Sequence, residues 1–258
     1  MHTVFRFLRQ LLLTVLLLAL LVLVAAGGYF AVTGHKLYES AIQVTPIDTL
    51  YSSISSREGF VPYAQLPQTY INAVISAEDS RFTHHKGVDP VSIARALVTD
   101  LRTGSFAEGG STITQQLIKN TVLTTWTQEK TLGERIKRKV QEQYLAIQLE
   151  KDTNDKSKIL EQYMNTINLG QNTLGVQAAS KRYFNKNVWE LSLSECATIA
   201  GITQNPSRFN PLSENGRKRN EEKRRVILQY MYEQGKITKD EQEEALADDV
   251  YSRIKNVD

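Results

Sequence analysis

An unbroken apolar run opens the hydrophobic pattern of the chain. No charged residue lies between Leu11 and Val32, and this stretch is almost entirely aliphatic. About 20 such residues cross the hydrocarbon core of a bilayer as a helix. Arg6 and Arg9 precede the run, and no Lys or Arg follows it before Lys36, a bias that favours a cytoplasmic N-terminus. The run is long and no small-x-small cleavage site follows it, so the pattern favours an uncleaved transmembrane helix over a signal peptide.

From Pro67 onward, apolar positions recur every three to four residues, which is the period of an amphipathic helix. Few convincing strands separate these segments, so the fold class is predicted to be mainly α. The predicted helices are Pro67–Arg81, Pro90–Arg102, Ile113–Leu123, Leu132–Lys151, Lys156–Asn165, Leu174–Phe184, Ser194–Thr203, Gly216–Glu233 and Lys239–Ala247. Before them the periodicity is weak, and Thr49–Ile54 is predicted to be a short strand.

These patterns divide the chain into consecutive regions. The predicted regions are a cytoplasmic N-terminus (1–10), a transmembrane helix (11–32), a connector (33–50), a main domain (51–250) and a C-terminal tail (251–258). A length of 258 residues with 41% hydrophobic residues suits one sizeable domain with a small appendage. The net charge of +3 does not demand a nucleic-acid partner, and a single cysteine, Cys196, excludes an intramolecular disulfide.

One carboxylate falls on an apolar stripe. Ile71, Val74, Ile75 and Phe82 line the core-facing side of the first predicted helix of the domain, and Glu78 occupies the position between them where another apolar residue is expected. A carboxylate held among apolar groups suits a general base that works near neutral pH. Two alternatives are that Glu78 faces solvent at the helix end, or that it pairs with a nearby arginine or histidine.

The residues after Glu78 strengthen the first interpretation. Asp79, Phe82, His85 and Gly87 follow within a few positions. As a metal site the segment is weak, because no second acid or histidine cluster has matching spacing. His85 is instead expected to form a hydrogen bond that fixes the loop.

This segment resembles the first motif of the family 51 glycosyltransferases, the peptidoglycan polymerases that occur alone or joined to transpeptidases in penicillin-binding proteins. The resemblance implies that Glu78 is the catalytic base and that Asp79, Phe82 and His85 belong to the substrate-binding site. It also implies a lysozyme-like, mainly α fold, with a small membrane-proximal subdomain near Val98–Trp126. The mixed apolar and basic segment Leu97–Phe106 is expected to lie at the membrane surface.

A second motif surrounds the start of the next helix. Gly109 and Gly110 form a permissive loop, and Thr112 with Gln115 has the spacing of a capping box. The free N–H groups of such a helix end favour an anion. Taken alone, this is also the pattern of an ordinary capped helix. The segment Gly109–Asn120 resembles the second motif of the same family, which implies that four residues contact the sugar and pyrophosphate of the substrate. These residues are Ser111, Gln115, Gln116 and Lys119.

A second acid stands beside basic residues in the segment Arg138–Glu142. Without other information, the spacing of Arg138 and Glu142 indicates a surface ion pair, which contributes only tenths of a kcal/mol to stability. The segment resembles the third family motif, which implies that Glu142 is the second catalytic acid and that Arg138 and Lys139 bind pyrophosphate. Glu142 is expected to orient a basic residue, to hold a divalent cation (Mg or Mn), or to protonate the leaving group. Lys130–Leu132 stands about one helical turn further from Glu142 than is usual in the family.

The later segments resemble the fourth and fifth family motifs and are expected to be structural. They include Ile159–Asn165 and Leu191–Ala197, and Cys196 in the second is expected to be a buried apolar residue. The basic run Arg217–Arg225 is expected to be a solvated helix face.

The resemblance as a whole implies a peptidoglycan glycosyltransferase of the outer face of a bacterial cytoplasmic membrane. Its substrates would be lipid II and the growing lipid-linked chain, joined into β-1,4 glycan strands with inversion and release of undecaprenyl pyrophosphate. The sequence contains neither a Ser-x-x-Lys nor a Lys-Thr-Gly motif, so a transpeptidase is expected only as a partner, and a monofunctional enzyme is favoured. The alternative function is a lysozyme-like murein hydrolase or lytic enzyme.

Overall fold

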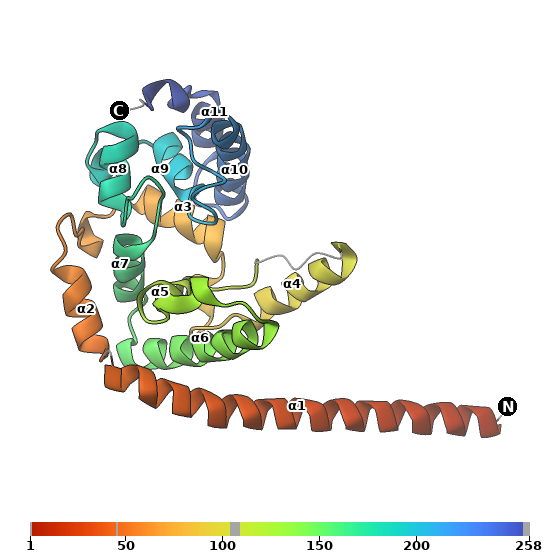
Figure 1. Cartoon of the computed structure of the whole chain (residues 1–258). Helices are drawn as coiled ribbons and strands as arrows, with labels where there is room; N and C mark the ends of the chain where they lie inside the picture. Colours follow the sequence, from red (N-terminus) through yellow and green to blue (C-terminus); the bar gives the residue numbers. More distant parts are fainter. Residues whose placement is uncertain (1, 45, 104–108, 255–258) are drawn as a thin grey trace.

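The computed structural model describes residues 2–44, 46–103 and 109–254, and this part of the chain folds into helices and turns without a β-strand (Figure 1). The mainly α prediction is therefore confirmed. The α-helices are α1 (His2–Val44), α2 (Ile47–Ser55), α3 (Gln68–Glu78), α4 (Pro90–Thr103), α5 (Ile113–Thr121), α6 (Leu132–Thr153), α7 (Lys156–Thr166), α8 (Val176–Phe184), α9 (Leu193–Ala200), α10 (Glu214–Glu233) and α11 (Lys239–Ala247). Short 3-10 helices are η1 (Tyr63–Gln65), η2 (Phe82–His84), η3 (Thr124–Gln128), η4 (Val188–Glu190) and η5 (Val250–Arg253).

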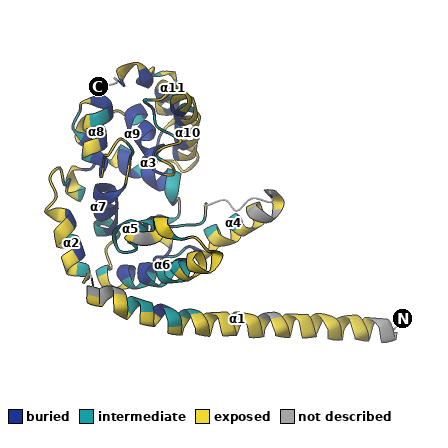
Figure 2. Cartoon of the chain, in the orientation of Figure 1, coloured by how far each residue is buried: buried dark blue, intermediate teal, exposed yellow. Residues whose placement is uncertain are grey.

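The N-terminal helix α1 is longer than the predicted span. It runs without a break to Val44, so most of the predicted connector is helical. The stretch Phe5–Ser40 is long and apolar enough to cross a membrane, and its most apolar part is not buried by the rest of the protein. Figure 2 shows this exposed length extending away from the folded body.

The strand predicted at Thr49–Ile54 is wrong, because these residues belong to α2. Leu50 and Ile54 lie one helical turn apart and are both buried, so the helical period decides the local structure. Pro46 immediately precedes the helix, where its fixed φ and missing N–H cost nothing. The short apolar run was compatible with either structure.

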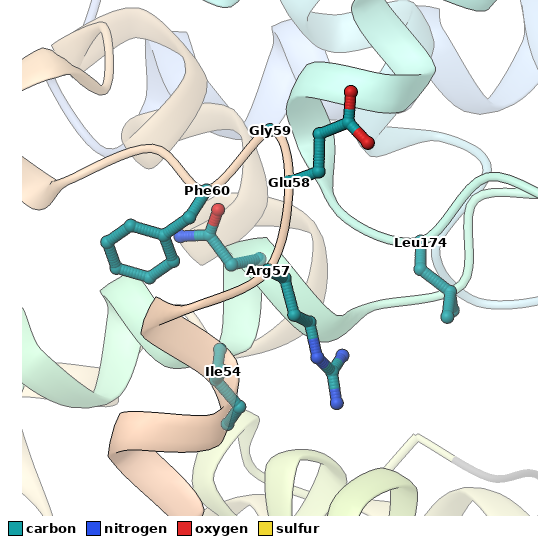
Figure 3. A pocket seen from close by; sticks show the side chains of 7 residues that line it. Ile54, Arg57, Glu58, Gly59, Phe60 and Leu174 are labelled. Atoms are coloured by element: carbon teal, nitrogen blue, oxygen red, sulfur yellow. The ribbon is translucent and has the colours of Figure 1, made fainter.

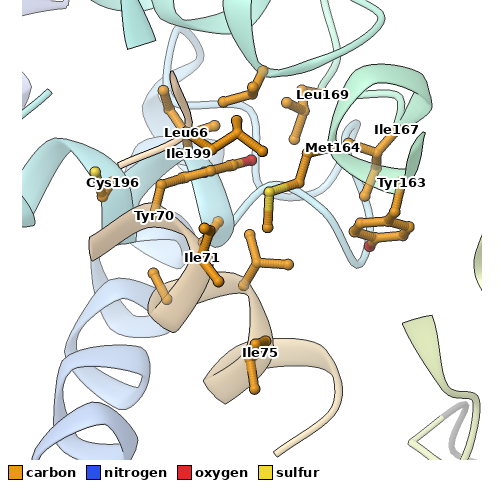
Figure 4. Close-up of a cluster of buried hydrophobic side chains, with 14 of the residues drawn as sticks. Leu66, Tyr70, Ile71, Ile75, Tyr163, Met164, Ile167, Leu169, Cys196 and Ile199 are labelled. Carbon is orange, nitrogen blue, oxygen red and sulfur yellow. The ribbon is translucent and has the colours of Figure 1, made fainter. Parts of the chain in front are cut away.

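The helices form two groups around a shared core. Helices α8, α9, α10 and α11 gather with α3, whereas α5, α6 and α7 pack together with α2 beside α7 (Figure 1). Side chains from α3, α7 and α9 meet between them, including Tyr70, Met164 and Ile199 (Figure 4). Cys196 is buried in α9 as expected. The packing brings the end of α3 against α5, which positions the first candidate acid.

Two surface expectations need correction or limitation. Arg224 in the basic run of α10 is buried, and its guanidinium donates to Ser194 Oγ and to the carbonyl of Ala245. The run is therefore not a solvated face throughout. The expected interfacial segment Leu97–Phe106 lies only partly in the described chain, because residues 104–108 are outside it. The described helix α4 presents Val91, Leu97 and Val98 at its surface.

Candidate active site

Glu78 is the last residue of α3 and is half-buried. Its carboxylate accepts a hydrogen bond of 2.7 Å from Gln116 Nε2 in α5, and another from the hydroxyl of Thr203, just after α9. Two neutral donors from distant parts of the chain therefore orient this carboxylate. The proposed pairing with arginine or histidine is not formed, because Arg81 pairs with Asp89 at 3.1 Å and His85 with Asp79 at 2.9 Å.

Gln116 is itself held by a buried tyrosine. The hydroxyl of Tyr163 donates to Gln116 Oε1 at 3.0 Å. Burial, reinforced by the nearby charge of Glu78, raises the pKa of Tyr163 well above its ordinary value, so this hydroxyl remains a donor. With its oxygen engaged by Tyr163, the amide of Gln116 presents its NH2 group to Glu78.

The loop after Glu78 is fixed by buried groups. The carboxylate of Asp79 binds His85 Nε2 and accepts a hydrogen bond of 3.1 Å from the backbone N–H of Ile113 at the start of α5. Phe82 is completely buried, with its ring against the edge of His85 and the ammonium of Lys156 4.2 Å from its centroid. The expectation that His85 fixes the loop is confirmed. Asp79, Phe82 and His85 are all buried, and their expected role in substrate binding stays a prediction.

Gly87 is the point where this loop touches α6. Its φ is +86°, and a Cβ at this position would lie 2.5 Å from the backbone carbonyl of Ala146. The Thr112 hydroxyl donates to the carbonyl of Gly87 at 2.6 Å. The predicted capping box of Thr112 and Gln115 is formed. The loop after Glu78, the start of α5 and the middle of α6 are therefore in direct contact.

Glu142 lies in a different environment on α6. Its side chain is only 1% exposed, and its two oxygens bind Arg138 and Lys139 at 2.6 Å each. Gln115 Nε2 approaches the same carboxylate at 3.4 Å. Leu145 and Leu149 continue the buried face of the helix. The interpretation as a surface ion pair is therefore wrong.

The cations around Glu142 have further partners. Arg138 also binds Glu129 at 2.7 Å, and Lys139 donates to Ser111 Oγ at 2.7 Å. Lys139 keeps more than a third of its side chain exposed and Arg138 about a fifth. The structure thus brings together Ser111, Gln115, Arg138, Lys139 and Glu142, with positive groups that remain accessible to an anion.

Lys119 makes a different contact from the residues of this cluster. Its ammonium lies 4.8 Å from the ring centroid of Trp126, a cation–π arrangement that links α5 to η3. Trp126 is partly exposed. Trp126 was not among the predicted site residues.

The expected divalent cation does not fit the residues around Glu142. Both of its oxygens already accept from positively charged groups, which would repel a metal ion. Among the described residues, no group of three His, Cys, Asp or Glu side chains has an arrangement that suits a metal. Glu142 instead binds the basic residues beside it, and its role in the reaction stays a prediction.

Sequence reasoning missed Tyr163 and Thr203. Tyr163 lies in a segment interpreted as structural, and Thr203 lies 125 residues after Glu78. A pocket in the structure lies elsewhere and is lined by Ile54, Arg57, Glu58, Gly59, Phe60, Asn165 and Leu174 (Figure 3). None of the predicted site residues lines it.

Comparison with known proteins identifies the family. The sequence profile of the family described as Transglycosylase matches residues 45–232. Penicillin-binding protein 1A of Aquifex aeolicus (strain VF5) is 44% identical over 198 residues, covering 76% of this chain and 26% of that protein. Penicillin-binding protein 1A of Haemophilus influenzae is 41% identical over 238 residues, covering 92% of this chain and 27% of that protein. The chain thus spans about a quarter of the length of these relatives.

A crystal structure of penicillin-binding protein 1A from Haemophilus influenzae aligns with 36% of this chain and 14% of that chain, at 46% identity and a TM-score of 0.34. The profile match extends over most of the chain, from the start of α2 to the last turn of α10. The chain belongs to the transglycosylase family.

Proposed function

We propose that this protein is a peptidoglycan glycosyltransferase that polymerises lipid II into β-1,4 glycan strands. The observation that carries this proposal is the contrast between two acids. Glu78 is half-buried and bound by neutral donors, whereas Glu142 is buried against two cations. A reaction between a sugar hydroxyl and a sugar pyrophosphate needs a base for the first and positive charge for the second.

In this mechanism Glu78 accepts the proton of the 4-hydroxyl of the acceptor sugar. The oxygen attacks the anomeric carbon of the lipid-linked growing chain, which inverts as its bond to pyrophosphate breaks. The hydrogen bonds from Gln116 and Thr203 hold the carboxylate in one orientation while each oxygen keeps capacity for a further bond. Orientation of this kind lowers the entropic cost of reaching the transition state.

The leaving pyrophosphate carries the developing negative charge. Arg138 and Lys139 are fixed by Glu142 and remain partly exposed, so they are suited to stabilise that charge. Ser111, which binds Lys139, lies just before the start of α5, where the helix dipole also favours an anion. Lys119 is proposed as a further contact of the pyrophosphate. Asp79, Phe82, His85 and Gln115 act indirectly, by holding the loop and the start of α5.

A lipid-linked substrate requires the site to lie at a membrane. We assign α1 as a single membrane span with its N-terminus in the cytoplasm and the remaining helices on the outer face, because basic residues precede the apolar run. A separate transpeptidase is proposed as the partner that cross-links the product. The murein hydrolase remains the alternative, but finished glycan offers no pyrophosphate for Arg138 and Lys139 to bind.

The test is a polymerisation assay with the purified full chain, labelled lipid II and a detergent in which the protein remains folded. Long glycan strands whose formation is blocked by a moenomycin-type inhibitor are the expected result. Parallel reactions with EDTA and with added Mg or Mn measure any metal requirement directly. Soluble fragments released from purified murein, without polymer from lipid II, would overturn the proposal in favour of the hydrolase.

A further inference from the structure

The C-terminal part of α1 packs tightly against α6. Gly34 is buried at this contact, and a Cβ there would lie 2.4 Å from Tyr144 Cδ2 and 2.9 Å from Tyr144 Cβ. Any side chain at position 34 would therefore displace the tyrosine or separate the helices. By contrast, a Cβ at Gly27, two turns earlier in α1, would meet nothing within 4 Å.

Aromatic side chains complete the contact. Phe30 and Tyr38 lie on either side of Gly34 in the sequence, and their ring centroids are 5.8 and 6.0 Å from that of Tyr144. The Tyr38 hydroxyl also donates to Asp152 at 3.0 Å, near the end of α6. We call these contacts between Phe30–Tyr38 and Tyr144–Asp152 the α1–α6 joint.

The two helices run in the same direction. Phe30 contacts Tyr144 whereas Tyr38 reaches Asp152, and the N-terminal end of α6 points the same way as the N-terminus of α1 (Figure 1). Because a helix rises about 1.5 Å per residue, Arg138 lies about 9 Å closer to the N-terminal end of α1 than Tyr144 does. That level corresponds to the neighbourhood of Gly28 in α1, close to the end of the apolar run at Val32.

The α1–α6 joint therefore fixes the position of α6 along the membrane-spanning helix α1. Helix α1 is continuous through the joint, so its membrane-spanning part and its contact with α6 belong to one rod. Between Arg9 and Gly34 this rod is about 37 Å long, enough for a hydrocarbon core of about 30 Å. Arg138 and Lys139 then lie near the outer end of the apolar span, close to the headgroups where the pyrophosphate of a lipid-linked substrate is held.

We propose that Gly34 and Tyr144 are positioning residues that hold the Arg138–Lys139–Glu142 cluster at the level of the substrate pyrophosphate. The inference rests on the proposed function and adds a role for the membrane helix beyond attachment. It requires that α1 remain docked on α6 during the reaction. If α1 no longer packed against α6, the Arg138–Lys139–Glu142 cluster would stay folded but would no longer be held at a fixed depth relative to the membrane.

The first arm compares Gly34→Leu with the matched Gly27→Leu in the full chain. Each variant is assayed with lipid II in vesicles and with a short-chain lipid II analogue dispersed in detergent, where no membrane plane exists. Gly34→Leu is expected to polymerise about tenfold more slowly in vesicles and to change little in detergent, because only the depth of the cluster is lost. Gly27→Leu is expected to match the wild type in both. Equal losses of Gly34→Leu in both media would indicate a merely structural role and overturn the inference.

The second arm uses the variant Gly34→Cys/Tyr144→Cys, since the native Cys196 is buried. A disulfide needs Cβ atoms about 3.8 Å apart, so a helix separation of roughly 1 Å suffices. The disulfide is expected to form in vesicles, and the oxidised protein to polymerise about tenfold faster than the reduced one. Equal rates of the two forms, or failure of the disulfide to form, would overturn the inference. A wild type that makes no polymer would instead overturn the proposed function, and the positioning role with it, even if the disulfide forms.

Discussion

Glu78 and Glu142 are the same chemical group in two different surroundings. Glu78 ends a helix, is half-buried and accepts from an amide and a hydroxyl. Glu142 lies in the middle of α6, is almost fully buried and is bound by Arg138 and Lys139 at 2.6 Å each. Within the described chain, no basic side chain forms an ion pair with Glu78.

The difference follows from how neighbouring charges are paired. Arg81 and His85 stand close to Glu78 in the sequence, but Asp89 and Asp79 bind them. Glu78 is thereby left with neutral hydrogen-bond donors, whereas Glu142 lies between two cations. The two carboxylates have different surroundings because their partners differ, and each of the following variants alters one side of that contrast.

The largest effect is expected for Glu78→Gln. An amide fits the same space but accepts no proton, so polymerisation should fall by about 10²- to 10⁴-fold, the usual contribution of a general base. Thermal stability should change by less than about 1 kcal/mol, because no ion pair is lost. Lipid II polymerisation and thermal unfolding of the same preparation measure both. The exposed Glu243→Gln serves as the control, and near-normal activity of Glu78→Gln would remove the base assignment.

Glu142→Gln is expected to disturb stability as well as activity. Two cations lose their shared anion, and the cost should be about 2 kcal/mol, below the 3–5 typical of a fully buried pair since both cations are partly exposed. Polymerisation should fall because Arg138 and Lys139 are no longer fixed. Chemical denaturation beside the activity assay tests this. If Glu142→Gln were as stable as Glu78→Gln, the two surroundings would not differ in the way described.

The variant Asp89→Asn tests why no basic side chain of the described residues pairs with Glu78. Burial alone would raise the pKa of Asp89, but hydrogen bonds from Ser92 and from the backbone N–H of Val91, with the charge of Arg81, lower it below its ordinary value. A depressed pKa adds stability that is present above the unfolded value of about 3.9 and is lost as the pH falls through the folded value. The variant should therefore lose about 1–2 kcal/mol at pH 7, and the loss should shrink as the pH falls below the unfolded value.

The same variant also frees Arg81 to approach Glu78. A cation paired with Glu78 would occupy the carboxylate that the proposed mechanism needs to accept a proton, so polymerisation should fall. Unfolding at several pH values and the rate of lipid II polymerisation check the two effects. A stability difference that persists unchanged at pH 3 would contradict the pairing of Asp89 described here.

The smallest effect is expected for Tyr163→Phe. Loss of its hydroxyl leaves the carbonyl of Gln116 without a donor, at about 1 kcal/mol, and loosens the amide that orients Glu78. Activity should fall a few-fold with no change in the pH limbs, because the raised pKa of Tyr163 keeps it protonated throughout. Tyr70→Phe is the matched control, since the buried hydroxyl of Tyr70 has no partner among the described residues. Equal behaviour of the two variants would argue against a role for Tyr163 in orienting Glu78.

Local signals predicted much of the fold. Helix α11 begins and ends at its predicted residues, and Thr238 caps its N-terminus. Helix α7 ends within one residue of its predicted limit. Helix α8 begins two residues later than predicted because Gly175, with a φ of +83°, precedes its first turn. Helix α2 was missed since its apolar positions are few, and only packing against α7 makes their helical spacing decisive.

The two acids of the site could be predicted from the sequence, but the residues that bind them could not. The misplaced polar residue on an apolar stripe pointed to Glu78, and basic neighbours at helical spacing pointed to Glu142. Thr203 carries no local signal, because its hydrogen bond to Glu78 depends on how α9 packs against α3. The burial of Phe82 and the joint at Gly34 likewise arise from tertiary contacts that no spacing encodes. The catalytic and binding roles themselves stay predictions.

The contact at Gly87 has a consequence for how the sequence tolerates change. The loop that follows Glu78 rests at this glycine on the backbone of α6, the helix that carries Glu142. The loop beside one acid and the helix that carries the other therefore meet at a position with no side chain, where even alanine would demand both a strained φ and a displaced backbone. In a saturation scan scored by growth, we expect position 87 to be depleted of substitutions as strongly as positions 78 and 142. A position without a reactive group would then carry as much selective constraint as the acids themselves.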